Sequence, residues 1–250
     1  MNVPYDPREG AAADQIRAVE SAAGGGPVVP VCGKGLTITG VIDTHVHADH
    51  VSGGRDLAAA LDVPYYLGAA ADVAFDVEPL ADGDVIEVGC REIEALHAPG
   101  HTAEMVVLHA EDYLLSADTL FVESVGRTEL QFGEAEAERG ARLLYETLHE
   151  TILALPGDTT VLPGHVSVTE DNRFEVGSPG EPVSARLGDL RDELDLLGLD
   201  QDEFVDRLTT DAPQEPPNYG TIGSINRGER RIESDAEATE PEVGPINCAA

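Results

Sequence analysis

Residues 36–50 read LTITGVIDTHVHADH and decide the fold. Residues 36–42 alternate and then become wholly apolar, which is typical of a strand entering a covered sheet. The part that follows places three imidazoles and one carboxylate within six residues: His45, His47, Asp49 and His50. Alternate side chains of an extended segment project to the same side, so His45 and His47 are predicted to face one site. Asp49 and His50 can reach it from the turn that follows.

This cluster points to a metal centre. Burying several titratable groups together is costly unless a metal ion compensates them. Three further candidates sit at turns or strand ends, where functional residues of layered α/β proteins gather. His101 and His165 each follow a Pro-Gly turn, and Asp118 ends an apolar strand. The remaining histidines are interpreted as structural or surface residues: His97, His109 and His149.

The rest of the chain predicts a layered α/β fold, because strands and helices alternate along it. Short strands are expected at 63–67, 84–88, 91–97, 104–110, 113–116 and 160–162. Helices are expected at 11–23, 54–61, 134–155 and 184–208. Residues 1–226 are interpreted as one domain with a C-terminal helical extension over 184–226. Residues 227–250 are acidic and almost free of large apolar groups, and we expect a disordered tail there.

The charge balance excludes some function classes. The 250 residues include 48 acidic and 15 basic ones, Lys34 being the only lysine, and the net charge is −33. Nucleic acids and anionic membranes require a basic surface, so neither is expected as a partner. Acidic residues are spread along the whole chain, which indicates a protein from a salt-adapted organism.

Cysteine usage and the N-terminus indicate a cytoplasmic protein. Cys32, Cys90 and Cys248 form neither a C-x-x-C pair nor an even set, so we expect isolated reduced thiols. No apolar run approaches the roughly 18 residues that span a bilayer. Residues 1–6 lack the basic and apolar pattern of an export signal.

The ordered motifs His-x-His-x-Asp-His, Gly-His-Thr, Ala-Asp-Thr and Pro-Gly-His resemble the metallo-β-lactamase superfamily over residues 36–226. The resemblance implies an αββα sandwich: two mixed β-sheets flanked by helices, with the metal site at one edge. It assigns one metal position to His45, His47, His101 and Asp118. It assigns a second position to Asp49, His50, His165 and the shared Asp118.

Two thiol-handling branches of the superfamily fit best: persulfide dioxygenases and glyoxalase II, a hydroxyacylglutathione hydrolase. Three stretches resemble the dioxygenases more: residues 42–54 (IDTHVHADHVSGG), 126–131 (GRTELQ) and 217–219 (PNY). That branch implies sulfide detoxification, in which O₂ oxidises a small thiol persulfide, such as glutathione persulfide, to sulfite. It also implies one iron(II) per chain, held by His45, His101 and Asp118. Around this ion, His47, Asp49, His50 and His165 would form a supporting shell.

The hydrolase alternative implies two metal ions, such as zinc, that activate a water to attack a thioester. Asp49 and His165 are then the candidate catalytic residues as well as ligands, with Asp49 a candidate proton acceptor. Because the ligand types are identical in both cases, one versus two metals stays open. The acidic surface disfavours other hydrolases of the superfamily, including nucleases. The complete ligand set disfavours a relative that has kept the fold and lost its catalytic activity.

Arg127 is the candidate for binding a substrate carboxylate, since its planar guanidinium can do so bidentately. The alternative is that Arg127 only pairs with a nearby acid such as Glu129. Val166-Ser167 departs from the family, which has a polar residue and then a substrate-contacting tyrosine there.

Residues 5–7 resemble the end of an early strand that normally follows two others. We therefore expect those N-terminal edge strands to be missing from this sequence. The explanation we favour is a translation start that was assigned too far downstream. The alternative is a sheet that has lost its edge strands. The helical region 184–208 could pack on a partner, as in a homodimer, or complete its own domain. We favour the second role.

Stability should rise steeply with salt. In molar KCl the screening length falls to about 3 Å, which relieves repulsion among the acidic groups. We expect the melting temperature, followed by circular dichroism, to increase between dilute buffer and molar KCl. An unchanged melting temperature would contradict salt adaptation.

Overall fold

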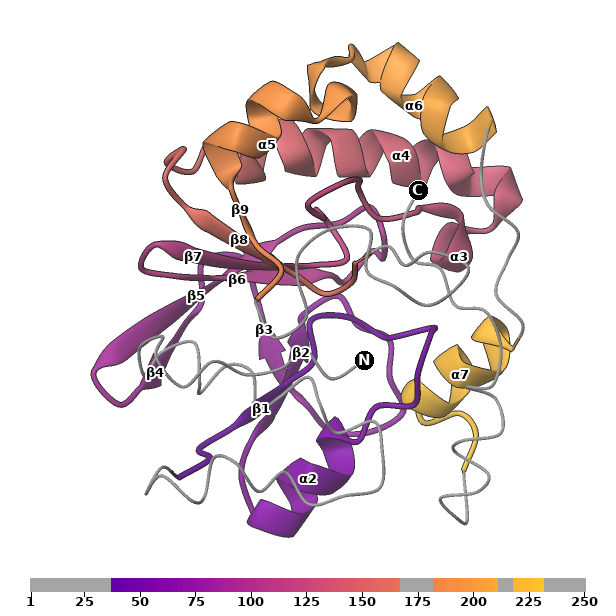
Figure 1. Cartoon of the computed structure of the whole chain (residues 1–250). Coiled ribbons are helices and arrows are strands. Elements are labelled where there is room, and N and C mark those ends of the chain that lie inside the picture. Colours follow the sequence, from indigo (N-terminus) through magenta and orange to yellow (C-terminus); the bar gives the residue numbers. More distant parts are fainter. Residues whose placement is uncertain (1–36, 167–181, 211–217, 232–250) are drawn as a thin grey trace.

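The computed structural model describes residues 37–166, 182–210 and 218–231, and its elements lie in four layers (Figure 1). The small sheet contains β1 (Val41–Ile42), β2 (Tyr65–Gly68) and β3 (Glu78–Leu80). The large sheet contains β4 (Val85–Val88), β5 (Arg91–His97), β6 (Val106–Ala110), β7 (Tyr113–Ala117), β8 (Thr160–Pro163) and β9 (Ala185–Arg186).

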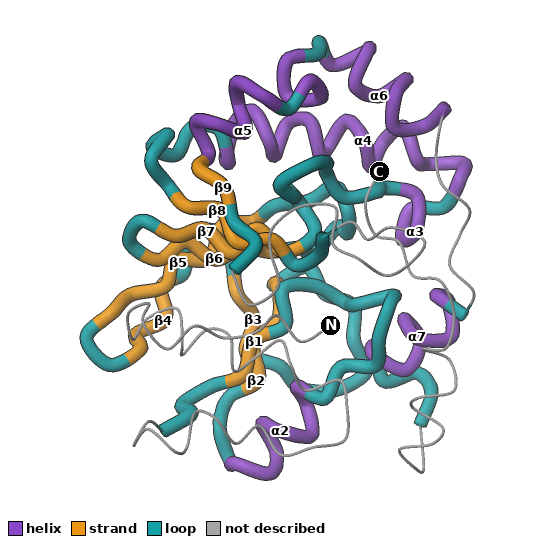
Figure 2. The backbone as a smooth tube through the Cα atoms, viewed as in Figure 1, coloured by secondary structure: helices purple, strands orange, loops and turns teal. Residues whose placement is uncertain are grey.

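Helices cover both outer faces of the sheet pair (Figures 1 and 2). The layer above the large sheet contains α4 (Ala137–Glu146), the π-helical turn η3 (Thr147–Ile152), α5 (Leu187–Glu193), the 3₁₀ turn η4 (Asp195–Gly198) and α6 (Gln201–Thr210). On the side of the small sheet lie α2 (Gly54–Leu61) and α7 (Tyr219–Asn226). The short α3 (Glu129–Phe132) and η2 (Glu134–Glu136) lead into α4. The predicted αββα sandwich is confirmed.

The topology differs between the sheets. In the large sheet, neighbouring strands pair in antiparallel fashion except β7 and β8, which are parallel. The small sheet's described strands pair only in parallel, in the order β1-β2-β3. Instead of two mixed sheets, the described residues therefore form one mixed and one parallel sheet.

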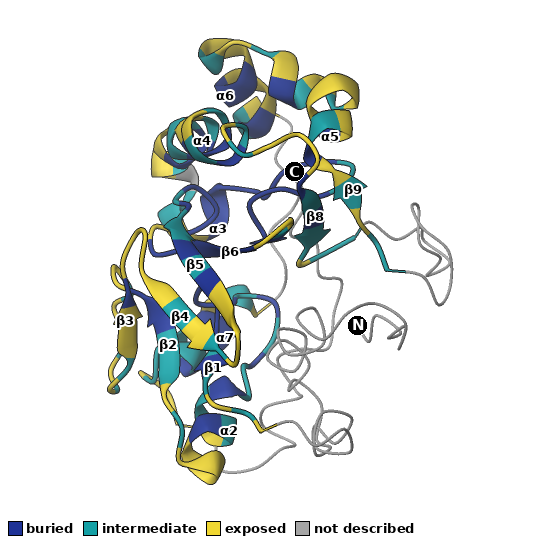
Figure 3. Cartoon of the chain, turned by 90° about the vertical axis from the view of Figure 1, so that its left-hand side faces the viewer, coloured by how far each residue is buried: buried dark blue, intermediate teal, exposed yellow. Residues whose placement is uncertain are grey.

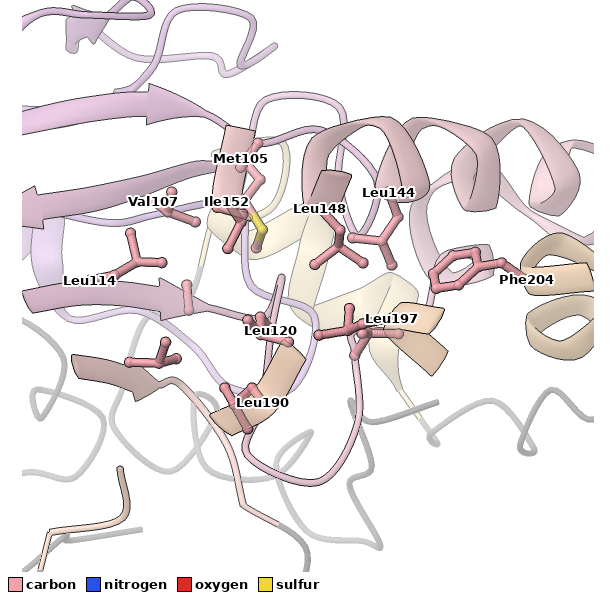
Figure 4. Close-up of a cluster of buried hydrophobic side chains, with 14 of the residues drawn as sticks. Met105, Val107, Leu114, Leu120, Leu144, Leu148, Ile152, Leu190, Leu197 and Phe204 are labelled. Atoms are coloured by element: carbon pink, nitrogen blue, oxygen red, sulfur yellow. The ribbon is translucent and has the colours of Figure 1, made fainter. Parts of the chain in front are cut away.

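Two apolar cores hold the layers together, and β6 contributes to both. Met105 and Val107 face the helical layer, where they join Leu144, Leu148 and Ile152 (Figure 4). Val106, Leu108 and Ala110, the alternate residues, face the small sheet. Figure 3 shows β6 largely in the dark blue of buried residues, below the helical layer. A strand buried on both faces needs consecutive apolar residues, which explains the apolar run 105–108 that precedes the partly buried His109.

Local chemistry explains where predicted elements end. The strand expected at 36–42 is reduced to Val41–Ile42, whose neighbour β2 is preceded by Pro64. Proline has no N–H to extend the ladder, although the Pro64 carbonyl still accepts from Val41 N (2.9 Å). The helical region 184–208 divides into α5, η4 and α6, and α6 begins after Asp200, whose Oδ1 accepts from Glu203 N (2.9 Å).

Several expectations concern residues outside the described ones: helix 11–23, the N-terminal edge strands, Cys32, Cys248 and the tail beyond residue 231. Cys90 is exposed and forms no disulfide. No helix within residues 37–166, 182–210 and 218–231 combines the length and the apolar character that crossing a membrane requires.

Candidate metal centre

Strand direction brings the candidate ligands to one edge of the large sheet. β5, β7 and β8 run the same way, so the segments after them leave from the same edge. These segments carry His101, Asp118 and His165. The loop after β1 joins them because the Thr44 carbonyl accepts from Val106 N at the start of β6 (2.9 Å). Residues far apart in sequence thus meet at one place.

The first cluster consists of His45, His101 and Asp118, whose potential ligand atoms all lie within 4.8 Å of one another. The Nε2 atoms of His45 and His101 lie 3.8 and 3.5 Å from Asp118 Oδ2. All three side chains are buried, with at most 2% exposed. Two imidazoles and one carboxylate therefore converge away from bulk water.

Hydrogen bonds orient the side chains of the first cluster for binding a metal ion. His101 Nδ1 donates to the Arg127 carbonyl (2.7 Å), which leaves Nε2 as the lone-pair nitrogen. Thr44 Oγ1 lies 3.0 Å from His45 Nδ1 and forms a hydrogen bond with it. His45 Nε2 and Asp118 Oδ2 are buried and have no hydrogen-bond partner. Buried polar atoms without partners are rare, and a divalent cation fits these donors.

The second cluster consists of His47, Asp49 and His50. His47 Nδ1 lies 3.8 Å from Asp49 Oδ1, and neither atom has a hydrogen-bond partner. His50 Nδ1 lies 3.1 Å from Asp49 Oδ2. His47 thus groups with Asp49 and His50, although its ring centre is also only 4.2 Å from that of His45. The two clusters are adjacent halves of one centre.

His165 joins the halves. Its Nδ1 lies 2.6 Å from Asp118 Oδ1 and its Nε2 lies 3.0 Å from Asp49 Oδ2. Gly164 allows this approach, since a Cβ there would lie 2.7 Å from Asp118 Oδ1. Gly126 is equally constrained, because its Cβ would lie 1.8 Å from the Asp118 carbonyl. Glycine is needed where chains approach this closely.

The protonation states match a cation site. Burial lowers the pKa of His45 well below its ordinary value, and His47 lowers it further. Burial would raise the pKa of Asp118, but the facing imidazoles, His165 foremost, hold it below its usual range. Burial also opposes charge on His165, yet Asp118 and Asp49 raise its pKa well above normal. An imidazole must be neutral to bind a metal ion, so metal binding by His165 would release a proton from its ring.

Asp49 and His50 form a similar pair. Burial would raise the pKa of Asp49, but hydrogen bonds with His165 and His50 hold it well below its usual value. For His50, the bond to Asp49 outweighs burial and raises the pKa. Both carboxylates of the centre therefore remain ionised at neutral pH.

Sequence reasoning missed Asp43, a buried supporting residue. Its Oδ2 accepts from Ser52 Oγ and from the Tyr65 hydroxyl, both at 2.5 Å, and its Oδ1 lies 4.0 Å from His47 Nε2. Burial and the Asp43 charge both raise the pKa of Tyr65, which therefore remains a donor. The sequence feature that could have identified Asp43 is its position two residues before the first histidine of the cluster.

A second missed residue is the buried Glu104, which has no signal in the local sequence. Its Oε1 accepts from Val46 N (2.9 Å), between two ligand histidines. Its Oε2 accepts from Gln131 Nε2 (2.7 Å) on α3. Glu104 thus fastens the histidine loop to the segment that follows Arg127.

Arg127 lies in the wall of the centre, with 1% of its surface exposed. Its Nε donates to Glu129 Oε1 (2.6 Å), the pairing considered as the alternative to substrate binding.

The three other histidines stand apart from the centre. His97 contacts the Ala103 carbonyl (2.9 Å), His149 stacks on Tyr145, and His109 Nδ1 lies 3.9 Å from Glu94 Oε2.

Removal of His101 tests the first cluster. We expect His101→Ala to lower tight metal binding at least about tenfold, because a site of three protein ligands loses one. His109→Ala is the matched control, since it removes a histidine on β6 outside both clusters. Metal content after dialysis, measured by atomic emission, provides the comparison. Equal metal content in the two variants would contradict the assignment.

The chain is similar to curated proteins of two kinds. The chain is 34% identical over 152 residues to the human mitochondrial persulfide dioxygenase ETHE1, covering 56% of each protein. It is 35% identical over 159 residues to a hydroxyacylglutathione hydrolase of Polaromonas sp. (strain JS666 / ATCC BAA-500), covering 61% of this chain and 58% of the other. The chain thus spans little more than half the length of these curated relatives.

A solved structure extends the likeness. The crystal structure of ETHE1 from Myxococcus xanthus superposes with a TM-score of 0.66 at 25% identity, covering 78% of this chain and 79% of the other. The curated relatives include persulfide dioxygenases and hydroxyacylglutathione hydrolases, and the comparisons do not separate these two branches. The model of the metallo-beta-lactamase superfamily matches residues 33–165, more than half of the sequence. The chain therefore belongs to the metallo-beta-lactamase superfamily.

Proposed function

We propose that this protein is an iron(II)-dependent persulfide dioxygenase. The observation that supports this most strongly is the first cluster: His45, His101 and Asp118 are buried together, and His45 Nε2 and Asp118 Oδ2 have no hydrogen-bond partner. Two histidines and one carboxylate are the ligand set of non-haem iron(II) oxygenases, and they leave coordination positions open. The similarity to persulfide dioxygenases of human and Myxococcus xanthus origin points the same way.

The proposed reaction converts one thiol persulfide, one O₂ and one water into the thiol and sulfurous acid, which ionises to sulfite. The terminal sulfur is oxidised and O₂ is reduced, while the sulfur–sulfur bond breaks and the released thiol gains a proton. The chemistry that iron(II) supplies in such a site is activation of O₂ beside a substrate sulfur. Glutathione persulfide is the proposed substrate, and any small thiol with a free carboxylate presents the same group.

The protein's own residues orient the ligands and hold water. His165 occupies Asp118 Oδ1, which leaves Oδ2 directed at His45 and His101. His47, Asp49 and His50 provide polar atoms on the other side, where a water can bind. Hydrogen bonds to the far nitrogen of each ligand histidine fix its ring, which strengthens the ligand.

The second cluster favours one alternative, a thioester hydrolase with two metal ions. His47, Asp49 and His50 could hold a second ion beside the first, with His165 and Asp118 between them. Asp49 would then be both ligand and proton acceptor, since it remains ionised. The likeness to hydroxyacylglutathione hydrolases supports this candidate.

Parallel assays distinguish the two reactions. Iron(II)-loaded protein in molar KCl should consume O₂ when glutathione persulfide is added and should leave S-lactoylglutathione intact. Asp49→Asn should retain one iron per chain, because Asp49 is absent from the first cluster. Hydrolysis without O₂ uptake would instead favour two metals, and Asp49→Asn should then lose one ion per chain and all hydrolysis.

We further propose that Arg127 binds the substrate carboxylate by exchanging it for Glu129. Arg127→Ala should raise KM at least about tenfold and leave kcat unchanged, the signature of uniform binding. The backbone carbonyl that holds His101 is retained in this variant. Loss of kcat alone, measured by steady-state O₂ uptake, would overturn the substrate-binding role in favour of simple pairing with Glu129.

A further inference from the structure

The second cluster is held in place by a residue from the C-terminal helix. Asn226, the last residue of α7, donates through Nδ2 to the carbonyls of His47 and His50, both at 2.8 Å. Its Oδ1 accepts from Ser52 N (2.9 Å). One side chain therefore uses both donors and its acceptor on the backbone of residues 47–52. Figure 1 shows α7 beside this loop.

α7 is itself fastened to the same half of the molecule. Ile222 and Ile225 pack with Val51 in a small buried cluster. Ala74 N donates to the Arg227 carbonyl directly after the helix (2.8 Å). These contacts place the amide of Asn226 opposite the loop without relying on the large sheet.

The effect of Asn226 reaches the ligand side chains through the loop. The Ser52 backbone binds Asn226, and the Ser52 hydroxyl binds Asp43, which faces His47 Nε2. The first cluster has other supports: Thr44 and Arg127 bind its histidines, and Asp118 ends β7. Displacing Asn226 should therefore disturb only one half of the centre.

We propose that Asn226 is a positioning residue for the second cluster, and that docking of α7 sets how well His47, Asp49 and His50 hold an ion or water. This inference holds for either proposed reaction, because it concerns the metal-binding loop alone. It also links the C-terminal helix to the metal centre by reciprocal coupling: an ion that orders the loop must stabilise α7 by the same free energy.

Two variants of Asn226 test the proposal. Asn226→Ala removes all three hydrogen bonds, whereas Asn226→Asp keeps an acceptor and turns a carboxylate towards two carbonyl oxygens. Ser224→Ala is the matched control, because the Ser224 hydroxyl donates only to the Thr221 carbonyl within α7 (2.8 Å). Amide hydrogen exchange of the metal-free proteins is followed by mass spectrometry, and Zn²⁺ binding by calorimetry.

We expect amides of residues 47–52 to exchange at least about tenfold faster in both Asn226 variants, with the segment around His101 unchanged. The weakest-bound Zn²⁺ should lose at least about tenfold in affinity, the range for residues that orient metal ligands. Ser224→Ala should match the wild type in both measurements. Unchanged loop exchange, or unchanged Zn²⁺ affinity in both Asn226 variants, would overturn the proposal.

A measurement on the unmutated protein keeps the test valid if the variants fold poorly. Saturation with Zn²⁺ should slow amide exchange in α7 several-fold as well as in residues 47–52. Protection confined to the loop, with α7 exchange unchanged, would show that the helix and the metal centre are not coupled.

Discussion

The buried carboxylate of Asp118 is the group on which the centre depends. It faces the imidazoles of His45, His101 and His165 and has almost no contact with solvent. A charge in such surroundings is tolerated only when opposite charge or hydrogen bonds compensate it. Glycines at 126 and 164 let the backbone come close enough for this compensation.

The two halves of the centre have different mechanical support. His101 and Asp118 leave strands of the large sheet, which is packed on both faces by apolar cores. The candidate ligands of the second cluster lie in a loop whose carbonyls accept hydrogen bonds from Asn226, more than 170 residues away in sequence. The first half therefore depends mainly on the packed sheet, whereas the loop of the second half depends on a side-chain amide of α7.

The apolar and polar patterns were sufficient to predict much of the fold. β5 matches its predicted range of 91–97, and the apolar face of the helix expected at 134–155 is buried at Leu144, Leu148 and Ile152. β3 was missed because it is short and contains Pro79, so its identity depends on pairing with β2. α7 lies within the helical extension expected over 184–226 but outside the helix expected at 184–208, because its few apolar residues gain their partner only from the loop at Val51.

The sequence by itself determined the superfamily and the candidate ligands, because closely spaced histidines and Pro-Gly-His turns are local patterns. The resemblance grouped His47 with His45, His101 and Asp118, and the sequence left open whether Arg127 is paired and what supports the histidine loop. The tertiary structure decided these points: Arg127 pairs with Glu129, His47 lies with Asp49 and His50, and the support includes Asn226. The physical reason is that hydrogen bonds and charge compensation act over a few ångströms in space, whereas the groups they join can be separated by most of the chain.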